Sequence, residues 1–482
     1  MMTGSEYRQS LKARKPLVVF MNGERMTGEP TEHPVVAASI NSIALTYELA
    51  EDPKYRSTLT ATSALTGKTI NRFCHLHNSP EDLYQKVGMQ RLLGQKCGTC
   101  FQRCVGMDAF NATNITSFEI DQHYGTDYHK RFVNYLKIAE ENDWVVDGAM
   151  TDPKIDRSLR PSQQPDAYVR VVERTPDGVV IRGAKMHQTG AINSHEIMVM
   201  PTLALKEDER DFAICCAIPA DADGIIYIYG RQTCDTRLTE DPPGESLDIG
   251  SIYGGQECII VFDDVFVPHE RIFMDGETDF SGRLVDTFAG YHRSSYACKT
   301  GVGDVAIGAA ALIADYNGTA KASHVKDKIV EMIHLNETIW SSCVACCYKG
   351  TETPAGNFLV DLLLANVAKH NVTRFPYEIA RLLQDIAGGL MVTMPGAKEF
   401  DNPETQKYIE LYLNGAGDGT AINRFKLLRL IENLTLGRAA VGYLTESMHG
   451  AGSPQAQRIM IARLADIGKK KDLAKRIARI EV

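Results

Sequence analysis

The apolar positions of this chain follow two different periods, and the period changes twice along its length. In the first 145 residues apolar side chains recur three and four positions apart, which predicts helices over residues 35–51, 79–94 and 128–142. From about residue 144 the pattern alternates as in strands. Residues 168–173 and 179–182 flank Thr175-Pro176-Asp177-Gly178, which is typical of a hairpin turn. After residue 281 the helical spacing returns and continues.

This order predicts an α+β multidomain protein. We expect an N-terminal helical domain over residues 1–145, a middle antiparallel β-barrel (or sandwich) over 146–280, and a C-terminal helical bundle over 281–482. Residues 121–135, polar on one side and aromatic on the other, are expected to lie in a helix against a core. The other predicted strands are 196–200, 212–218, 224–229 and 257–262, and the later helices are 302–316, 324–347, 359–370, 374–390 and 422–435.

The composition is ordinary for a globular protein, with 44% hydrophobic and 23% charged residues. The net charge of −9 argues against a nucleic-acid partner, because a phosphate backbone needs a basic face. No uninterrupted apolar run approaches the roughly 20 residues that span a bilayer, which argues against a membrane partner. Residues 1–15 lack the apolar centre of a signal peptide. We therefore expect a cytoplasmic enzyme.

Three of the twelve cysteines, Cys97, Cys100 and Cys104, lie within eight residues. Cys100 and Cys104 are four apart, so on a helix they would project from one face and could ligate one metal centre. Cys97 and Cys100 alone could also form a redox pair or half of a zinc site. Because zinc and a [4Fe–4S] cluster accept the same ligands, spacing leaves both open beside ordinary buried thiols. A distant segment, residues 291–299, adds His292 and Cys298.

The order of regions resembles the acyl-CoA dehydrogenase architecture, in which a flavin lies between the barrel and the C-terminal helices. Residues 261–268 look like the strand that leaves the barrel in that superfamily. Residues 183–190 resemble the segment that sets a threonine against the flavin in the 4-hydroxyphenylacetate 3-hydroxylase family, and residues 148–153 resemble the other flavin-facing strand. The cofactor-binding residues that this resemblance implies are Gly148, Met150, Thr151, Arg157, Gln188 and Thr189, with Arg157 near the pyrophosphate.

Nearly the whole chain resembles the 4-hydroxybutyryl-CoA dehydratase/vinylacetyl-CoA delta-isomerase family. The segments that carry this resemblance are residues 90–110, 180–202, 254–273, 288–316 and 442–461. The family holds FAD and a [4Fe–4S] cluster, and it implies the cluster ligands Cys100, Cys104, His292 and Cys298. Cys97 is left as a spare thiol. Ala297-Cys298-Lys299 is one residue shorter than the family's Gly-Gly-Cys-Lys, and the resemblance also implies an acyl-CoA substrate and a homotetramer.

The implied reaction is a radical-type dehydration of 4-hydroxybutyryl-CoA to crotonyl-CoA, with isomerisation of vinylacetyl-CoA to crotonyl-CoA. The hydroxyl on C4 is not β to the acidic C2 proton, so an ordinary elimination next to a thioester does not apply. The family's route removes the C2 proton, passes one electron to FAD so that the C3 hydrogen becomes acidic, and returns the electron after hydroxide leaves. The cluster would serve as a Lewis acid and as a structural clasp.

The resemblance places several ionisable residues where this route needs them. His292 is the expected base for the C2 proton, and Tyr296, four residues later, would share its helix face. Lys299 is expected to stabilise an anion. Glu446 is a second acid–base candidate and Glu257 a weaker one. Gly450 and Gly452, which follow Glu446, would let backbone approach the flavin or a neighbouring subunit.

Two other functions stay open at this point. A flavin-dependent aromatic hydroxylase or acyl-CoA dehydrogenase on the same fold would not need Cys100, Cys104 and Cys298. A non-catalytic iron–sulfur or zinc redox protein would use those thiols but would leave the flavin-like strands and Glu446 without a purpose.

Overall fold

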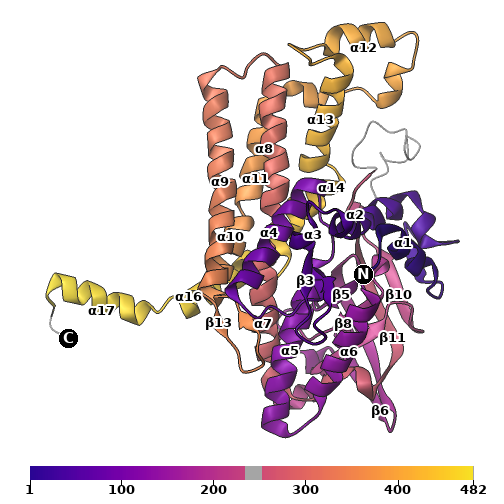
Figure 1. Ribbon diagram of the computed structural model, residues 1–482, viewed down its shortest axis with the longest axis vertical. Helices are drawn as coiled ribbons and strands as arrows, with labels where there is room; N and C mark the ends of the chain where they lie inside the picture. The colour runs from indigo at the N-terminus through magenta and orange to yellow at the C-terminus, as the bar shows by residue number, and fades with distance from the viewer. Residues whose placement is uncertain (234–251, 481–482) are drawn as a thin grey trace.

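The computed structural model describes residues 1–233 and 252–480, and its elements follow the predicted order of helices, strands and helices (Figure 1). The first region is mainly helical, with two short strand pairs. Its helices are α1 (Gly4–Lys12), α2 (Pro34–Glu51), α3 (Arg56–Leu59), α4 (Pro80–Cys97), α5 (Cys104–Tyr124) and α6 (Tyr128–Asn142), and its strands are β1 (Val18–Met21), β2 (Glu24–Arg25), β3 (Thr60–Thr62) and β4 (Thr69–Asn71).

The prediction of one helix over residues 121–135 is wrong, because α5 ends at Tyr124 and α6 begins at Tyr128. Gly125 adopts a left-handed φ of 68°, which glycine does at no steric cost. The Asp121 carboxylate then accepts hydrogen bonds from the backbone nitrogens of Tyr128 and His129, both at 2.9 Å. This carboxylate therefore satisfies the exposed N–H groups at the start of α6.

The strands form two open sheets. The six-stranded sheet has the order β2-β1-β10-β11-β7-β6 and the four-stranded sheet the order β12-β9-β8-β5. The pairs β1–β10 and β5–β8 are parallel, so neither sheet is purely antiparallel. Among the described residues no closed barrel forms, and the predicted barrel is not confirmed. The strands of the middle region are β5 (Val146–Ala149), β6 (Arg170–Thr175), β7 (Gly178–Thr189), β8 (Glu196–Val199), β9 (Ile214–Pro219), β10 (Ile225–Tyr229), β11 (Glu257–Pro268) and β12 (Ile272–Asp275).

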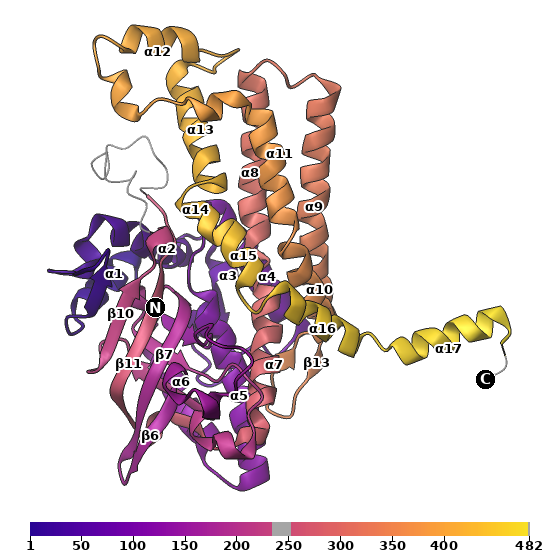
Figure 2. The same ribbon diagram turned by 180° about the vertical axis from the view of Figure 1, so that it is seen from behind.

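The two sheets and the first helices stack in layers. Ile181 and Ile260 of the six-stranded sheet share one apolar core with Ile197 and Ile218 of the four-stranded sheet. The four-stranded sheet packs its other face against α5 and α6 through a second core. Figure 1 shows these helices in front of the strands, and Figure 2 shows the six-stranded sheet from the opposite side. The first region therefore covers one face of the sheets.

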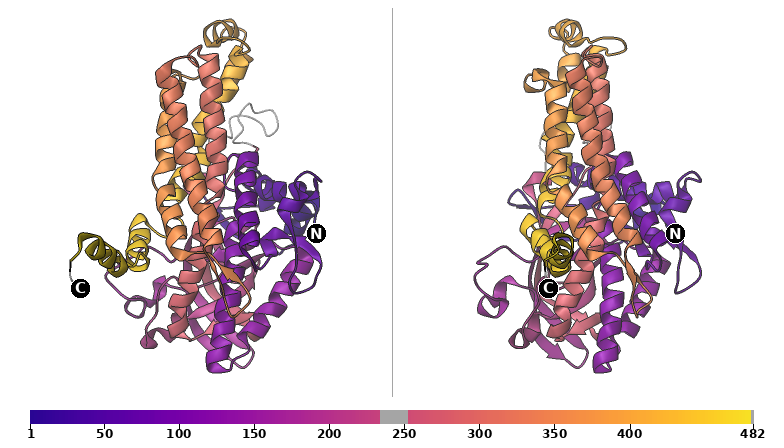
Figure 3. Two further views of the ribbon diagram at one scale, coloured as in Figure 1. Left: turned by 60° about the vertical axis from the view of Figure 1, so that its left-hand side comes forward. Right: turned by 90° about the vertical axis from the view of Figure 1, so that its left-hand side faces the viewer.

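The last region is a bundle of long helices that extends beyond the rest of the molecule (Figure 3). A short helix, α17, projects away from the body (Figure 2). The helices of this region are α7 (Thr278–Ser295), α8 (Cys298–Tyr316), α9 (Ser323–Tyr348), α10 (Leu362–Val372), α11 (Phe375–Ala387), α12 (Gln406–Leu413), α13 (Ala421–Thr435), α14 (Arg438–Ala440), α15 (Glu446–His449), α16 (Pro454–Leu464) and α17 (Ile467–Ala478), with a small strand pair, β13 (Thr351–Glu352) and β14 (Phe358–Leu359).

One helical stretch, Thr278–Tyr316, is long and apolar enough to cross a membrane by length and composition, with a mean hydropathy of 1.4 in its most apolar window. This stretch is not an uninterrupted apolar run in the sequence, because polar residues interrupt α7 and α8. In the structure 67% of that window is buried inside the protein. The core helix of a globular domain meets the same criterion, so this stretch is weak evidence for a membrane span.

Candidate functional site

Three thiols from separate elements gather between the first and the last region. Cys104 is the first residue of α5, Cys298 is the first residue of α8, and Cys100 lies in the loop between α4 and α5. All three are buried, with 6–7% of each residue exposed. Burial raises the pKa of each thiol, and negative charge on the other two raises the pKa of Cys100 further. The predicted meeting of these cysteines is therefore present.

The expectation that Cys100 and Cys104 share a helix face is wrong, because residues 98–103 are not helical. Gln102 has a φ of 64°, and its side-chain amide donates to the carbonyls of Ser39 and Gly254 at 3.0 and 3.1 Å. The buried Arg103 lies over the ring of Tyr47 at 4.3 Å. These contacts fix a short loop, so that Cys100 comes close to Cys104 without a helix.

Two glycines allow α8 to pack closely on α4, and this contact brings Cys298 to the site. A Cβ on Gly94 would lie 2.4 Å from the carbonyl oxygen of Cys298, and a Cβ on Gly301 would lie 2.0 Å from that of Arg91. Both distances are shorter than van der Waals contact allows. The start of α8 can therefore come close to the loop of residues 98–103, called the thiol loop below, because neither helix has a side chain at these two positions.

Cys97 is a neighbour of this group with partners of its own. Its Sγ donates to the carbonyls of Leu93 and Thr99, at 3.0 and 3.1 Å. Burial raises the pKa of Cys97 to about 12, and negative charge on Cys298 adds to the shift. The thiol is thus hydrogen-bonded within this chain, and its place as a spare thiol or an alternative ligand stays a prediction.

His292 lies on α7, with its ring between two aromatic side chains. The ring stacks on Phe288 at 5.3 Å between centroids and meets Tyr296 edge-on at 5.6 Å. Its Nδ1 lies 2.9 Å from an oxygen of the buried Asp108. Negative charge on Asp108 also acts on Cys104 and Cys298, so the imidazole and the thiols share one neighbourhood.

Tyr296, Lys299 and Glu446 converge beside the thiols. The Nζ of Lys299 donates to Oε2 of Glu446 at 3.0 Å, and the hydroxyl of Tyr296 donates to the backbone carbonyl of Glu446 at 3.5 Å. Burial alone would lower the pKa of Lys299, but the Glu446 carboxylate and the nearby thiols raise it above its ordinary value. Lys299 is therefore a permanent buried cation.

Glu446 follows a π-helical turn, Val441–Thr445, of the kind that often marks functional sites. A Cβ on Gly442 would lie 3.3 Å from both Cys100 Cβ and Glu446 Oε2. The widened turn therefore sets this carboxylate directly against the thiol loop.

The two glycines after Glu446 lie against side chains of this chain. A Cβ on Gly450 would lie only 1.7 Å from the Tyr296 hydroxyl oxygen, so this glycine makes room for the tyrosine. Gly452, with a φ of 97°, lies beside the Arg293 guanidinium, and Arg293 donates to the carbonyl of Ala451 at 3.1 Å. Backbone thus approaches side chains of this chain at both positions, while their prediction as flavin contacts remains untested.

Lys369 of α10 is a member of this group that the sequence did not reveal. It is fully buried, its Nζ lies 4.4 Å from the centre of the Tyr296 ring, and it donates to the carbonyl of Ser447 at 2.5 Å. Burial lowers the pKa of Lys369 to about 7, against the opposing effect of Glu446. A lysine on an amphipathic helix normally faces solvent, so no sequence signal pointed to it.

Glu257 lies at the start of β11, paired in register with Thr189 at the end of β7. The Thr189 hydroxyl is 2.8 Å from both carboxyl oxygens. Burial raises the pKa of Glu257 well above its ordinary range, and the negative charge of Glu446 raises it further. Glu257 is therefore a partly buried carboxylic acid at the edge of the same site rather than a solvent-exposed one.

The two segments predicted to face a flavin lie against each other. The backbone nitrogen of Met186 donates to the carbonyl of Thr151 at 2.8 Å. Buried Lys185 donates to the carbonyl of Met150 at 2.8 Å and pairs with Asp152 at 2.6 Å. Gly148 is buried in β5, the buried Gln188 donates to the carbonyl of Met186, and Arg157 is exposed on the loop after β5.

The family can be decided from a comparison with known proteins. The family model for the N-terminal part of 4-hydroxyphenylacetate 3-hydroxylase matches residues 3–274, and the model for its C-terminal part matches residues 281–479. The chain belongs to the 4-hydroxyphenylacetate 3-hydroxylase family.

Within the 4-hydroxyphenylacetate 3-hydroxylase family one branch is much more similar than others. The chain is 57% identical to the 4-hydroxybutyryl-CoA dehydratase/vinylacetyl-CoA-Delta-isomerase of Clostridium aminobutyricum, with all of both sequences covered. A solved structure of an oxygen-tolerant archaeal 4-hydroxybutyryl-CoA dehydratase from N. maritimus has 54% identity and a TM-score of 0.96, covering 100% of this chain and 95% of that one. The predicted family resemblance is confirmed, and with it the prediction of an enzyme.

A more distant structure of the 4-hydroxyphenylacetate 3-hydroxylase family supports the fold. The oxygenase component of a 4-hydroxyphenylacetate 3-monooxygenase, solved with FAD, has 24% identity and a TM-score of 0.86, covering 99% of this chain and 98% of that one. The two chains therefore share one fold, and the mixed multidomain fold predicted from the sequence is confirmed at this level.

The donor set can be compared with what an iron–sulfur cluster needs. Such a cluster is bound by thiolates and, in some proteins, by imidazole. The site provides three buried thiols and the imidazole of His292, whose Nδ1 contacts Asp108. Within residues 1–233 and 252–480, no group of three or more His, Cys, Asp or Glu side chains is compact enough to hold a metal ion. A four-iron cluster binds each ligand at a different iron, so its ligands lie further apart than those of one ion. The donors fit such a cluster in chemistry.

Proposed function

We propose that this chain dehydrates 4-hydroxybutyryl-CoA to crotonyl-CoA and isomerises vinylacetyl-CoA to crotonyl-CoA. The observation that carries the proposal is the convergence of Cys100, Cys104 and Cys298 on Tyr296, Lys299 and Glu446. The full-length identity of 57% to an enzyme named for these reactions supports it.

The proposed cofactors are FAD and a [4Fe–4S] cluster. Cys100, Cys104, Cys298 and His292 would hold the cluster, and the ends of β5 and β7 with Thr151, Gln188 and Thr189 would meet the flavin. When bound, the flavin supplies one-electron chemistry for a radical route, and the cluster supplies Lewis acidity toward the substrate hydroxyl.

His292 is the proposed base for the proton on C2 of the substrate. A base needs a nitrogen with a free lone pair in reach of that proton. Of the two ring nitrogens of His292, Nδ1 has a hydrogen-bond partner among the described residues and Nε2 has none. Nε2 can therefore bind iron or accept the substrate C2 proton, one role at a time. Phe288 and Tyr296 hold the ring on both sides.

Lys299, Glu446 and Tyr296 form the proposed group that handles the departing hydroxyl. Lys299 carries a fixed positive charge beside Glu446, which suits the negative charge that develops on the hydroxide oxygen as it leaves C4. The Tyr296 hydroxyl is a neutral donor, because burial raises its pKa well above 10. It can therefore hydrogen-bond the substrate hydroxyl without losing its proton.

Glu257 is the proposed proton donor at the flavin-facing edge of the site. Burial and the negative charge of Glu446 raise the pKa of its carboxyl well above the ordinary range, which favours the protonated form that can donate. Thr189 fixes its orientation. The buried Tyr296 and Lys299 limit the access of water to this side of the site.

The proposed substrate is an acyl-CoA thioester, and the proposed assembly is a homotetramer. Exposed apolar residues on α17, which projects from the body, provide surface that assembly would cover. The proposal includes no nucleic-acid partner.

Anaerobic incubation with 4-hydroxybutyryl-CoA tests the function, with crotonyl-CoA measured by chromatography. Iron, sulfide and FAD are counted on the same sample. We expect turnover together with four irons and one FAD per chain, and loss of both iron and turnover in Cys100→Ser and Cys298→Ser. A cluster-replete protein without turnover overturns the substrate assignment, while an iron-free yellow protein favours the hydroxylase alternative.

A further inference from the structure

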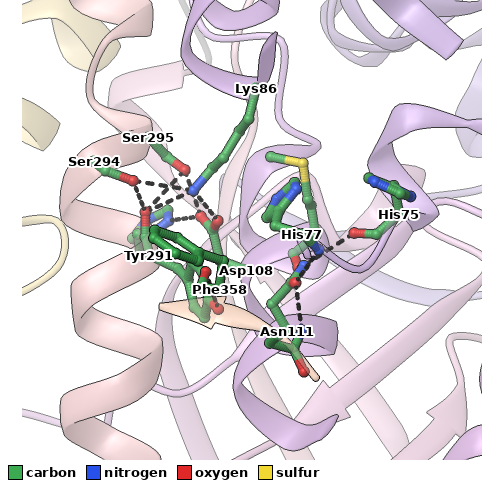
Figure 4. Close-up of polar contacts among 12 residues, drawn as sticks. His75, His77, Lys86, Asp108, Asn111, Tyr291, Ser294, Ser295 and Phe358 are labelled. Atoms are coloured by element: carbon green, nitrogen blue, oxygen red, sulfur yellow. Dashed lines mark hydrogen bonds and ion pairs between the residues drawn. The ribbon is translucent and has the colours of Figure 1, made fainter. Parts of the chain in front are cut away.

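The carboxylate of Asp108 connects three helices in the interior of the protein. It is fully buried on α5, and its Oδ2 accepts hydrogen bonds from Ser295 Oγ at 2.7 Å and faces His292 Nδ1 at 2.9 Å. Its Oδ1 pairs with the Nζ of Lys86 on α4 at 2.8 Å. Figure 4 shows Lys86, Asp108, Ser294 and Ser295 pointing toward one another.

The contacts of Asp108 determine which nitrogen of His292 carries the imidazole proton. The buried carboxylate is paired with the Lys86 cation at 2.8 Å and accepts from Ser295 Oγ at 2.7 Å, as an ionised carboxylate does. An ionised carboxylate only accepts hydrogen bonds. The Nδ1 of His292 must therefore be the donor, and in a neutral ring the lone pair is then on Nε2.

Lys86 is in turn held so firmly that it fixes the carboxylate. Its Nζ donates to the carbonyl of Tyr291 at 2.9 Å and to Ser294 Oγ at 3.1 Å, and it lies 5.4 Å from the centre of the Tyr291 ring. These partners belong to the last turn of α7, the helix that carries His292. The cation therefore orients Asp108 and anchors the same helix end.

We infer that Asp108 and Lys86 are positioning residues that hold His292 in the tautomer with Nε2 free to bind iron. The inference rests on the proposed function, because it gives the free nitrogen a ligand. Carboxylates that orient metal-bound histidines in this way are a general feature of metal sites.

The substitution Asp108→Asn tests the inference because it keeps the shape and changes the hydrogen-bonding pattern. The remaining amide oxygen will face the cation of Lys86, which turns the NH₂ group toward His292. That donor requires Nδ1 to accept, so the ring proton moves to Nε2 and the free lone pair is lost. Anaerobically reconstituted protein should then lose iron to a chelator at about 10- to 100-fold lower chelator concentration than wild type, with a changed electron paramagnetic resonance signal.

The matched control is Glu119→Gln. Glu119, on α5 like Asp108, accepts from Arg283 of α7 at 2.8 and 2.9 Å, so this substitution removes a charged acceptor from another ion pair between the same two helices that does not contact His292. We expect iron retention and the resonance signal to stay at wild-type values.

A second pair of variants also removes the buried Lys86. These variants do not leave its cation buried without the Asp108 carboxylate, so a folding defect from that charge is avoided. In a Lys86→Met background, Asp108→Asn can turn its oxygen to His292, whereas Asp108→Leu, of similar size, offers no acceptor. We expect the asparagine double variant to retain more iron than the leucine one, and more than Asp108→Asn alone.

The outcomes separate this inference from the proposed function. Wild-type protein that takes up no iron overturns both. Wild-type protein with iron, together with Asp108→Asn protein of equal iron retention and unchanged signal, overturns the positioning role alone. Equal iron retention in the two double variants does the same.

Discussion

At the scale of single residues, the site depends on where side chains are missing as much as on where they are present. Tyr296 reaches Glu446 because Gly450 leaves space for its hydroxyl, and Cys100 packs on Gly442 next to the same carboxylate. From the sequence Gly450 was expected to approach the flavin or a neighbouring subunit. Its contact with Tyr296 could not be predicted, because a glycine in a sequence does not show which group needs the space.

Gly450→Ala should therefore act through Tyr296. Its Cβ would lie 1.7 Å from the hydroxyl oxygen, so the ring must move by more than an ångström. Displacement of this size typically costs about 100-fold in turnover. We expect that loss in kcat for dehydration, measured anaerobically with iron and FAD content unchanged.

The control for this substitution is a double variant. When Tyr296→Phe removes the hydroxyl, the closest contact disappears, and Gly450→Ala should add little to the loss that Tyr296→Phe causes alone. An equal additional loss in both backgrounds would show that the glycine acts on something other than Tyr296.

At the scale of elements, the helix boundaries follow from local rules and the helix contacts do not. Helix α6 was predicted with its observed bounds, since apolar spacing defines it. The break at Gly125 and the extended Cys100 loop depend on side-chain contacts with Asp121, Ser39 and Gly254 that spacing cannot show. The parallel pairing of β1 with β10 joins residues about 200 positions apart, and no local pattern encodes it.

The candidate cluster ligands could be proposed from the sequence because a cysteine-rich motif and a family resemblance mark them. Lys86, Asp108 and Lys369 could not, since each is a single polar residue on an ordinary helix. Their partners lie on other helices, far away in the sequence. Only the packing of α4, α5, α7 and α10 shows that these charges are buried.

The packing of α8 on α4 yields a prediction at this scale. Gly301→Ala places a Cβ 2.0 Å from the Arg91 carbonyl, so the helices must separate and carry Cys298 with them. We expect a loss of about 1–3 kcal/mol in stability from overpacking and a lower iron content. Thermal unfolding and iron analysis measure these effects.

Gly308→Ala on the same helix is the matched control, because a Cβ there meets nothing within 4 Å. Replacing a mid-helix glycine by alanine should raise stability by roughly 0.5–1 kcal/mol and leave iron unchanged. If both variants changed stability and iron content in the same way, the contact between α8 and α4 would be excluded as the cause of the Gly301→Ala effects.

The docking of α1 on the strands predicts a pH dependence. His195 Nδ1 accepts the backbone N–H of Val145 at 2.9 Å, and its Nε2 lies 2.8 Å from Ser10 Oγ of α1. Burial, with the charges of Arg14 and Arg103, lowers the pKa of His195 to about 3. The unfolded chain binds this proton near pH 6.5 and the folded chain does not, so stability from this group is lost as the pH falls from 6.5 toward 3.

His195→Asn keeps an acceptor for Val145 and removes the titration. Between pH 7 and pH 4 the melting temperature of wild type should fall further than that of the variant, by the equivalent of about 3 kcal/mol. Equal falls in both proteins would contradict a neutral, buried His195.

At the scale of the whole molecule, two features extend from the body, the long helical bundle and α17 (Figures 1 and 3). Helix α17 has no buried residues, and Ile467, Leu473 and Ile477 are 50%, 44% and 78% exposed. Apolar side chains so exposed on a projecting helix are a candidate surface for the proposed subunit contact.

Removal of residues 467–482 should therefore change assembly and spare the protomer. We expect sedimentation velocity to show a species smaller than the proposed tetramer, with far-UV circular dichroism and the fold of the protomer retained. Lys471→Ser, which removes an exposed charge from the same helix, is the control. An unchanged sedimentation coefficient after truncation would place the subunit contacts elsewhere.

The closure of α8 on α4 also sets an order of events during synthesis. Cys100 and Cys104 leave the ribosome nearly two hundred residues before Cys298, and all three are closed off once Gly94 and Gly301 meet. Iron for the proposed cluster would therefore be delivered before the last region folds, or the interface would have to reopen. Maturation of the proposed cluster would thus compete with folding, and reconstitution of the folded protein would require this interface to open.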